Sequence, residues 1–242
     1  MSALQQALIA ASAGGGSGDD VILLMHLDGA DGSTSYPDAS TYAHSTSGQG
    51  SAQIKTAQSK YGGASAFFEG SASYLYVTHH AKFNFGAADF SVEAWVYPTD
   101  SSAADYRAII CHDSIGGTRG WLLFCDITTG YLTGILWDGG TSETVSGSSN
   151  FLSDNLNTWT HVAMTRDGST LRLFVNGTVI DTNASAGLTI GSNSMPLVIG
   201  TLYGAGVPIA GTKWKGYVDE VRVISGTAHY TAGFTPAGPF TL

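Results

Sequence analysis

The sequence is poor in charged residues, which make up only 12% of its 242 residues. Ten Lys and Arg residues stand against nineteen Asp and Glu residues, so the formal net charge is −9. Nucleic acids and anionic membrane surfaces both attract proteins through basic patches, and the scarcity of Lys and Arg argues against either partner. Long apolar runs are also missing: no segment approaches the roughly 20 apolar residues of a membrane-spanning helix, so we expect no membrane insertion.

Cysteine is scarce as well, with only Cys111 and Cys125 in the chain. Residues 107–112 and 121–126 are predicted to form a hairpin. Its antiparallel register would place Cys111 opposite a residue near Trp121, and Cys125 would then lie about 13 Å further along, at about 3.3 Å per residue. A disulfide needs Cα atoms about 4.4–6.8 Å apart. The register therefore predicts two free, buried thiols, which suit folding in a reducing compartment.

Glycine is abundant, with 32 residues, and so are Ser and Thr. Helix-favouring Glu, Lys and Arg are few, and this composition indicates short strands joined by many turns. Phe90–Tyr97 has the period-2 alternation typical of a strand, and the dipeptides Asp167-Gly168 and Asn176-Gly177 are strong hairpin signals. The other predicted strands are 21–27, 65–69, 74–77, 108–112, 121–125, 131–137, 158–166, 170–175, 178–181, 197–200 and 216–224.

About twelve strands at short intervals, with no long amphipathic helix between them, predict an all-β fold. This is too many strands for one immunoglobulin-type sandwich and suits a two-sheet antiparallel jelly-roll sandwich. A chain of 242 residues can form one such unit. We place this single domain at residues 19–242, with residues 225–242 as a tail across its surface.

The first 18 residues differ in composition from the rest of the chain. We expect residues 1–13 to form one short helix and residues 14–18 (GGGSG) to form a flexible linker. The segment lacks Lys and Arg, and its apolar run is interrupted by two glutamines, unlike a secretory signal. We interpret residues 1–13 as an attachment peptide whose Leu4, Leu8 and Ile9 bury in a partner protein.

Four segments, in their order along the chain, resemble laminin-G-like, concanavalin A-like domains. They are His26-Leu-Asp-Gly29, Phe90-Ser-Val-Glu-Ala-Trp-Val96, Trp159-Thr-His-Val-Ala163 with the hairpin that follows it, and Gly216-Tyr-Val-Asp-Glu-Val-Arg-Val-Ile224. The resemblance implies a concanavalin A-like sandwich over about residues 20–235. It leaves the function open, because lectins, adhesive modules and glycosidases all use this fold.

The segment from Arg222 to Pro236 resembles domains found in bacteriophage virion proteins. In physical terms it predicts an extended strap that packs Tyr230 and Phe234 against the sandwich. The resemblance implies a structural or adhesive role on a virion.

An enzyme of this fold would need a catalytic constellation, which we do not find in the sequence. Glycoside hydrolysis uses two carboxyl groups about 5–9.5 Å apart, yet Glu93 is the only acidic residue of its strand. Asp219 and Glu220 are neighbours, so their side chains point to opposite faces. No Gly-x-Ser-x-Gly elbow follows a strand and opens a helix, and the histidines lack the spacing of a zinc site. We therefore predict that the protein is not an enzyme.

Calcium is the cofactor that the acidic residues favour. It takes six to eight oxygen ligands from carboxylates and loop carbonyls, and Asp28, Asp31 and Asp38 gather in one Gly-, Ser- and Asp-rich loop. The first and last strands commonly pair in domains of this family, which would bring Asp28 close to Asp219. We predict a structural Ca²⁺ at Asp28 and Asp219. The alternative is that Asp28 and Asp31 make Asx turns and that Asp219 accepts hydrogen bonds from buried amides.

Two aromatic residues are candidates for stacking against a sugar. Trp137 and Tyr106 lie beside predicted loops, whereas the other four tryptophans follow strand patterns and are predicted to lie in the core. We therefore name Trp137 and Tyr106 as candidate ligand-binding residues.

Three hypotheses for the function remain. The one we favour is a non-catalytic virion protein, of the capsid-decoration or tail-fibre type. It would display the sandwich for surface or glycan binding, and its N-terminal peptide would tether it to other virion proteins as a homo-oligomer. The second is a carbohydrate-binding or adhesion module of a secreted bacterial protein, located outside the cell or on its surface. The third is a glycoside hydrolase or lyase of the same fold.

Overall fold

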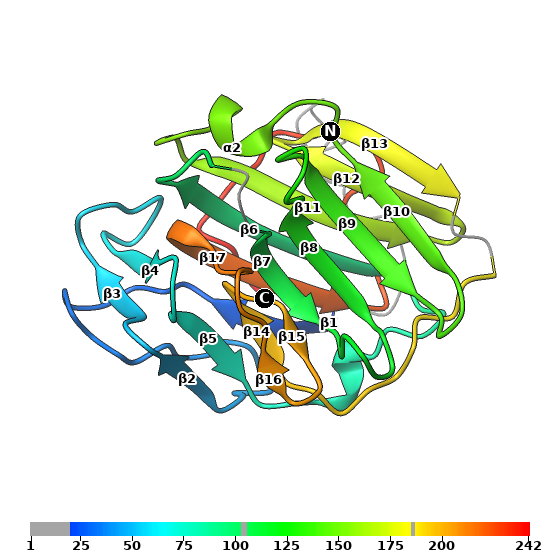
Figure 1. Ribbon diagram of the computed structural model, residues 1–242, viewed down its shortest axis with the longest axis horizontal. Helices are drawn as coiled ribbons and strands as arrows, with labels where there is room; N and C mark the ends of the chain where they lie inside the picture. The colour runs from blue at the N-terminus through cyan, green and yellow to red at the C-terminus, as the bar shows by residue number, and fades with distance from the viewer. Residues whose placement is uncertain (1–19, 103–105, 185–186) are drawn as a thin grey trace, which may run out of the picture.

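Two antiparallel sheets stack face to face in the computed structural model, which describes residues 20–102, 106–184 and 187–242 (Figure 1). The eight-stranded sheet has the order β13 (Thr178–Ala184), β12 (Thr170–Val175), β11 (Thr160–Asp167), β6 (Phe90–Pro98), β17 (Lys215–Ser225), β4 (Ser65–Glu69) and β3 (Gln53–Lys55), with β1 (Asp20–Met25) paired to β17. The seven-stranded sheet has the order β10 (Ser142–Ser146), β9 (Leu132–Trp137), β8 (Trp121–Cys125), β7 (Arg107–His112), β14 (Leu197–Ile199), β5 (Tyr74–Val77) and β2 (Thr46–Gln49). The smaller elements are the hairpin of β15 (Tyr203–Gly204) and β16 (Val207–Pro208), the 3₁₀ turn η1 (Ala81–Phe83) and the helix α2 (Phe151–Asp154).

This arrangement confirms the predicted all-β, two-sheet antiparallel sandwich. Within the described ranges, no helix has the length and apolar character needed to cross a membrane.

The space between the sheets is filled by one large apolar cluster. Strand β6 shows how the sequence produces it, because Phe90, Val92, Ala94 and Val96 alternate into this cluster and are completely buried. The residues between them face the other side of the sheet, as the period of two requires. The predicted alternation of this strand therefore sets which face is the core.

The outer face of the eight-stranded sheet is covered by residues 226–242, which we call the C-terminal strap. The rings of Tyr230 and Phe234 stack with their centroids 3.5 Å apart. Both rings pack on Phe174 of β12, at centroid distances of 6.1 Å and 5.4 Å. The structure agrees with the expected strap and shows why the positions behind it, such as Glu93 and His161, are buried.

Strand ends differ from the prediction where the backbone turns. The first strand was expected to reach Leu27 but ends at Met25, and Leu27 has φ +59°, a left-handed conformation that leaves the sheet. The strand expected from Thr158 begins at Thr160, after Asn157 with φ +55°. Five short strands were not predicted: β2, β3, β10, β15 and β16.

Candidate functional site

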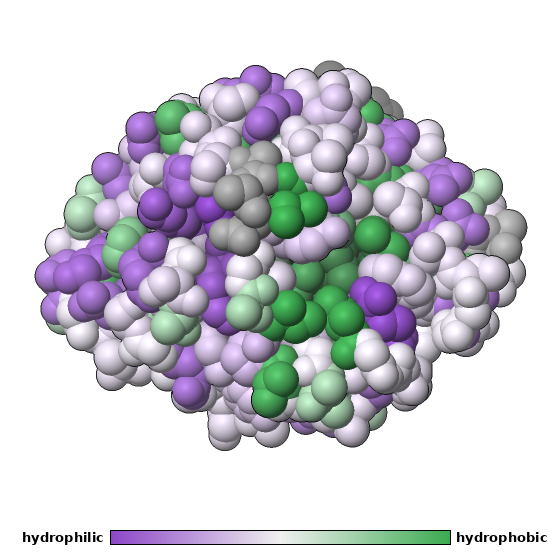
Figure 2. Space-filling model, in the orientation of Figure 1, coloured by the Kyte–Doolittle hydropathy of each residue, from purple (hydrophilic) through white to green (hydrophobic). Residues whose placement is uncertain are grey.

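The outer face of the seven-stranded sheet carries a second apolar cluster. In β8, Trp121, Leu123 and Cys125 belong to the core between the sheets, whereas Leu122 and Phe124 belong to this outer cluster. Outward positions of an antiparallel sheet are usually polar, and a contiguous apolar area there indicates a binding surface. Figure 2 shows an apolar area in the middle of this face.

A groove of about 370 Å³ lies in the outer cluster. Its lining includes Tyr106, Arg119, Phe124, Ile135, Trp137 and Thr212. Tyr106 precedes β7 and Trp137 ends β9, and they reach one groove because β7, β8 and β9 are neighbours in the sheet. The ring of Tyr106 meets that of Phe124 edge-on, with 5.6 Å between centroids. The structure thus brings together the two residues that the sequence singled out for sugar stacking.

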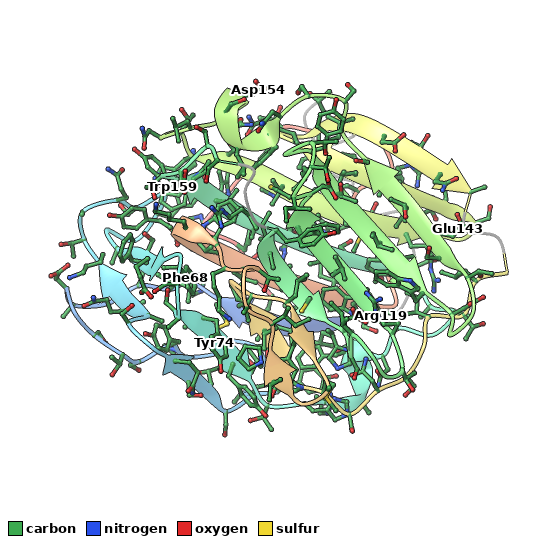
Figure 3. The ribbon with its side chains drawn as sticks, in the orientation of Figure 1. Phe68, Tyr74, Arg119, Glu143, Asp154 and Trp159 are labelled. Atoms are coloured by element: carbon green, nitrogen blue, oxygen red, sulfur yellow. The ribbon has the colours of Figure 1, made fainter. Side chains whose placement is uncertain are left out.

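Arg119 lines the groove beside Trp137. Its guanidinium carbon lies 3.6 Å from the centroid of the Trp137 ring. The same guanidinium binds Asp113 through Nε, at 2.9 and 2.8 Å from the two carboxylate oxygens, and through Nη2 at 2.7 Å. Asp113 is completely buried and also accepts the backbone N–H of Gly120 at 2.8 Å. The Arg119 guanidinium is therefore held over the Trp137 ring, and Asp113 balances its charge. Figure 3 shows the position of Arg119 on this face.

A second candidate site surrounds Asp219 on β17. Its Oδ2 accepts the backbone N–H groups of Lys60 and Tyr61, at 2.7 and 3.1 Å. Its Oδ1 is buried and has no hydrogen-bond partner among the described residues. Burial raises the pKa of Asp219 to about 7, and the negative charges of Glu220 and Asp28 act in the same direction. Near neutral pH this carboxyl group is therefore stabilised by taking up a proton or a cation.

Asp28 lies beside Asp219 because β1 pairs with β17, with Met25 opposite Val221. The Asp28 carboxylate occupies the space next to Gly62, where any side chain would overlap it. The structure therefore brings Asp28 and Asp219 together, as expected from the pairing of the first and last strands.

The unpartnered Oδ1 of Asp219 fits a hard cation, which binds oxygen. However, the described part of the chain has no group of three or more His, Cys, Asp or Glu side chains that could hold a metal. Calcium would then need backbone carbonyls or water as its further ligands, and the site stays a prediction. The alternative interpretation holds in part, since Asp219 does accept two backbone amides.

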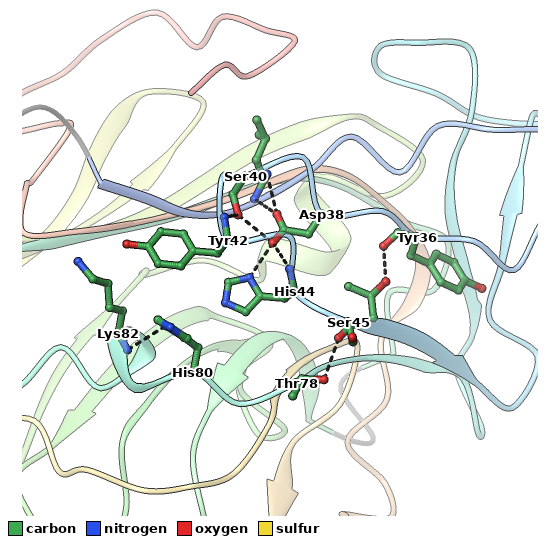
Figure 4. A network of polar contacts seen from close by, with 11 residues as sticks. Tyr36, Asp38, Ser40, Tyr42, His44, Ser45, Thr78, His80 and Lys82 are labelled. Carbon is green, nitrogen blue, oxygen red and sulfur yellow. Dashed lines mark hydrogen bonds and ion pairs between the residues drawn. The ribbon is translucent and has the colours of Figure 1, made fainter.

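The other two acidic residues of the early loop have local partners. Asp38 accepts the backbone N–H groups of Ser40 and His44, both at 2.9 Å, and Nδ1 of His44 lies 2.6 Å from it (Figure 4). Asp31 is exposed and accepts the backbone N–H of Thr56 at 3.1 Å. These contacts order the loop, and of its three aspartates it is Asp28 whose charge acts on Asp219.

Two residues that line the groove were not predicted, and three predicted partner-binding residues are not among those that the structure describes. Leu4, Leu8 and Ile9 fall outside the described residues. Arg119 and Phe124 were not predicted to line a site. The signal that could have indicated them is the strand Trp121–Cys125, which is apolar at every position and so must present apolar side chains on both faces.

A family model described as the concanavalin A-like lectin/glucanases superfamily matches residues 68–228. Comparison with curated proteins gives no match. Among solved structures, the binding domain of Paraclostridial Mosquitocidal Protein 1 is similar, with a TM-score of 0.67 and 16% identity over 87% of this chain and 50% of that one. A further similar structure is the botulinum neurotoxin serotype D ligand binding domain in complex with N-acetylneuraminic acid, with a TM-score of 0.62 and 16% identity over 85% of this chain and 47% of that one.

The botulinum neurotoxin serotype C1 binding domain is also similar, with a TM-score of 0.63 and 18% identity over 85% of this chain and 48% of that one. The chain thus spans about half the length of these structures. At such identities the likeness concerns the fold alone.

Proposed function

This chain belongs to the concanavalin A-like lectin/glucanases superfamily, and we propose that it is a non-catalytic module that binds a glycan in the groove of its seven-stranded sheet. The observation that carries the proposal is the groove itself, an aromatic-lined hollow on an outward face that would otherwise be polar. Its volume of about 370 Å³ lies within the range of about 300–1,000 Å³ that is usual for small-molecule sites.

The chemistry of the lining suits a sugar ring. A pyranose has an apolar C–H face, which packs on partly exposed aromatic and aliphatic side chains such as Tyr106 and Ile135, and a rim of hydroxyl groups. Arg119 supplies polar N–H groups to the lining of the groove. Small-molecule sites usually have a mostly apolar lining with a few polar groups, and these polar groups orient the ligand. That a similar domain was solved with N-acetylneuraminic acid supports a glycan as the ligand class.

The test is a glycan array, followed by titration of the glycans that bind. We expect Tyr106→Ala and Trp137→Ala each to weaken binding by at least about tenfold, since one buried aromatic contact is worth about 1.5–3 kcal/mol. Trp159→Ala is the matched control, because Trp159 is also half-buried but packs on Tyr97 of the other sheet, at a centroid distance of 5.4 Å. Equal binding by all three variants, or no glycan bound by the parent protein, would overturn the proposal.

The proposal also contains a prediction about catalysis. The purified protein should release no reducing ends from common β-glucans or galactans. Glu93, the acidic residue of the central strand β6, is buried behind the C-terminal strap and its carboxylate is already bound by three side chains. Release of reducing ends that Glu93→Gln abolishes would favour the hydrolase hypothesis instead.

We further propose that the module is part of a virion and is attached by residues 1–13. The support is the resemblance of the strap to phage proteins and the apolar Leu4, Leu8 and Ile9 of the N-terminal peptide. One such peptide would bind weakly, because ordering it costs about 1–2 kcal/mol per residue. Several copies in a homo-oligomer, such as a trimer, would gain from effective concentration.

Deleting residues 1–18 tests the attachment. We expect the melting temperature to stay nearly unchanged and incorporation into the phage particle to be lost. If the truncated protein still incorporates, the sandwich itself carries the attachment. If the full-length protein is absent from purified particles, the secreted bacterial adhesion module becomes the better hypothesis.

A further inference from the structure

A second, polar pocket lies across a short loop from the groove. It has a volume of about 570 Å³. Consecutive residues of the loop 113–119 contribute to both hollows: Ser114 and Thr118 line the pocket, and Ile115 and Arg119 line the groove. The other pocket residues that the argument uses are His79, Asn84, Ser192, Asn193 and Met195. Met195 also packs against the outer apolar cluster that forms the groove, so the two hollows adjoin.

The wall of the pocket is held by hydrogen bonds between its own residues. Asn84 and Asn193 bind each other twice, since the Asn84 amide donates to the Asn193 carbonyl and accepts the Asn193 backbone N–H, both at 3.0 Å. Nδ1 of His79 lies 3.3 Å from Nε2 of the completely buried His112 and 3.2 Å from the Met195 carbonyl. Such a wall is formed before a ligand arrives, which reduces the entropy lost on binding.

The loop between the two hollows is also fixed at both ends. The N–H of Ile115 donates to the Tyr203 carbonyl at 3.2 Å, and that of Gly117 donates to the Ser114 carbonyl at 2.8 Å. At the other end, the Arg119 guanidinium is bound to the buried Asp113. The loop is thus an ordered segment that separates the apolar groove from the polar pocket.

We propose that the polar pocket is a second subsite of the glycan site, so that the protein binds a neutral oligosaccharide that crosses the loop 113–119. This inference rests on the proposed glycan function. One sugar unit would pack its apolar face in the groove, and a following unit would exchange hydrogen bonds with the hydroxyl groups of Ser114, Thr118 and Ser192. The half-buried Asn84 amide keeps a second N–H and a second lone pair for the same purpose. Both donors and acceptors are present in these side chains, as sugar hydroxyls require.

The charges of the two hollows favour a neutral sugar. Among the residues that the structure describes, no Asp, Glu or Lys lines either hollow, and the Arg that lines the groove, Arg119, is paired with Asp113. A carboxylate sugar such as N-acetylneuraminic acid would have to share Arg119 with that buried carboxylate. A neutral oligosaccharide requires no such exchange.

The test is calorimetric titration of the full-length protein with neutral oligosaccharides of one to six units, built from glucose, mannose, galactose or N-acetylglucosamine. We expect at least one series to gain about tenfold or more in affinity from the monosaccharide to the trisaccharide. Ser194→Trp places a bulky ring at an exposed pocket position. It should remove this gain while leaving monosaccharide binding unchanged. Ser169→Trp, at an exposed turn between β11 and β12, is the matched control.

The outcomes separate the two proposals. Two results would overturn the second subsite: an affinity that does not depend on oligosaccharide length, or a gain in affinity with length that persists in Ser194→Trp. The groove would then remain the proposed glycan site. Tighter binding of N-acetylneuraminic acid-terminated than of neutral oligosaccharides would overturn the neutral class. Binding of none of these sugars by the parent protein would overturn the glycan function itself, and the second subsite with it.

Discussion

Glu93 of β6 and Arg222 of β17 form an ion pair that is closed off from solvent by the C-terminal strap. Nε and Nη2 of Arg222 lie 2.8 and 2.6 Å from Oε1 of Glu93. The other carboxylate oxygen is bound by Nε2 of His161 at 2.9 Å and accepts the hydroxyl of Tyr230 at 3.0 Å. Burial acts to raise the pKa of Glu93, but the hydrogen bond from His161 and the charge of Arg222 hold it below its ordinary value.

Breaking this pair should destabilise the sandwich strongly. Arg222→Met leaves the buried Glu93 carboxylate without its cation, and we expect a loss of about 3–5 kcal/mol in the free energy of unfolding. Tyr230→Phe removes one hydrogen bond from the strap and should cost about 0.5–1.5 kcal/mol. Chemical denaturation measures both.

The double variant Glu93→Gln with Arg222→Met is the control for this first prediction. Once the carboxylate is neutral, the loss of Arg222 should be much less harmful, so the two changes should not be additive. Additive effects, or a loss below about 1 kcal/mol for Arg222→Met, would mean that the ion pair does not hold the strap and sheet together.

The fold was predictable because its central strands carry their pattern in the sequence. The alternation of Phe90–Pro98 and the two Gly-containing turns after β11 and β12 depend only on neighbouring residues. The short strands were not predictable in the same way. β2 (Thr46–Gln49) and β10 (Ser142–Ser146) have no apolar alternation, and they are strands because β5 and β9 offer them backbone partners.

The candidate site was predictable only in part. Trp137 and Tyr106 were chosen because each lies beside a loop, and the sequence could not show that they share one groove. That depends on the order β7–β8–β9 and on the loop that brings Arg119 over Trp137. The pairing that brings Asp28 to Asp219 followed from the family resemblance, but the unpartnered Oδ1 of Asp219 is a fact of packing.

A second prediction concerns acid. Burial lowers the pKa of His112 to about 3, whereas an unfolded histidine titrates near 6.5. Between these values the unfolded chain binds a proton that the folded protein does not bind, so stability falls as the pH is lowered. His112 alone should lower the free energy of unfolding by about 1.4 kcal/mol for each pH unit of acidification over most of that interval.

The measurement is the free energy of unfolding between pH 4.5 and 6.5 for the parent protein and for His112→Gln. The variant should be less stable at pH 7, because a well-packed side chain is replaced, but its stability should fall less steeply with acid. Parallel curves for the two proteins would show that His112 is not kept neutral by the fold.

The third prediction concerns the thiols. Cys111 pairs with Leu122 and lies in the outer cluster, whereas Cys125 pairs with Arg107 and lies in the core between the sheets. Both are free and completely buried, and burial raises the pKa of each thiol above its ordinary value. Because the thiolate is the reactive form, we expect almost no reaction with a thiol reagent in the native protein. The denatured, unreduced protein should give two thiols per chain; finding none would contradict the β7–β8 register.

The last prediction concerns calcium at Asp28 and Asp219. An ion that binds only the folded protein stabilises it by about 2.7 kcal/mol at a concentration 100 times its dissociation constant. For a domain of this size, 1 kcal/mol corresponds to about 2–4 °C in melting temperature. Chelation should therefore lower the melting temperature by about 5–10 °C, and elemental analysis of the untreated protein should find one calcium per chain.

Three variants assign the ion to its site. Asp219→Asn and Asp28→Asn should each abolish the response to chelation, because each removes one of the two carboxylates predicted to bind the ion. Asp31→Asn should retain the full response, since Asp31 lies in the same loop but binds the backbone of Thr56 instead. If the parent protein shows neither a shift on chelation nor any bound metal, the carboxyl group of Asp219 must be held by a proton. Asp219→Asn would then leave the protein as stable as before, or more stable, at pH 8, where the native carboxyl would have lost its proton at a pKa of about 7.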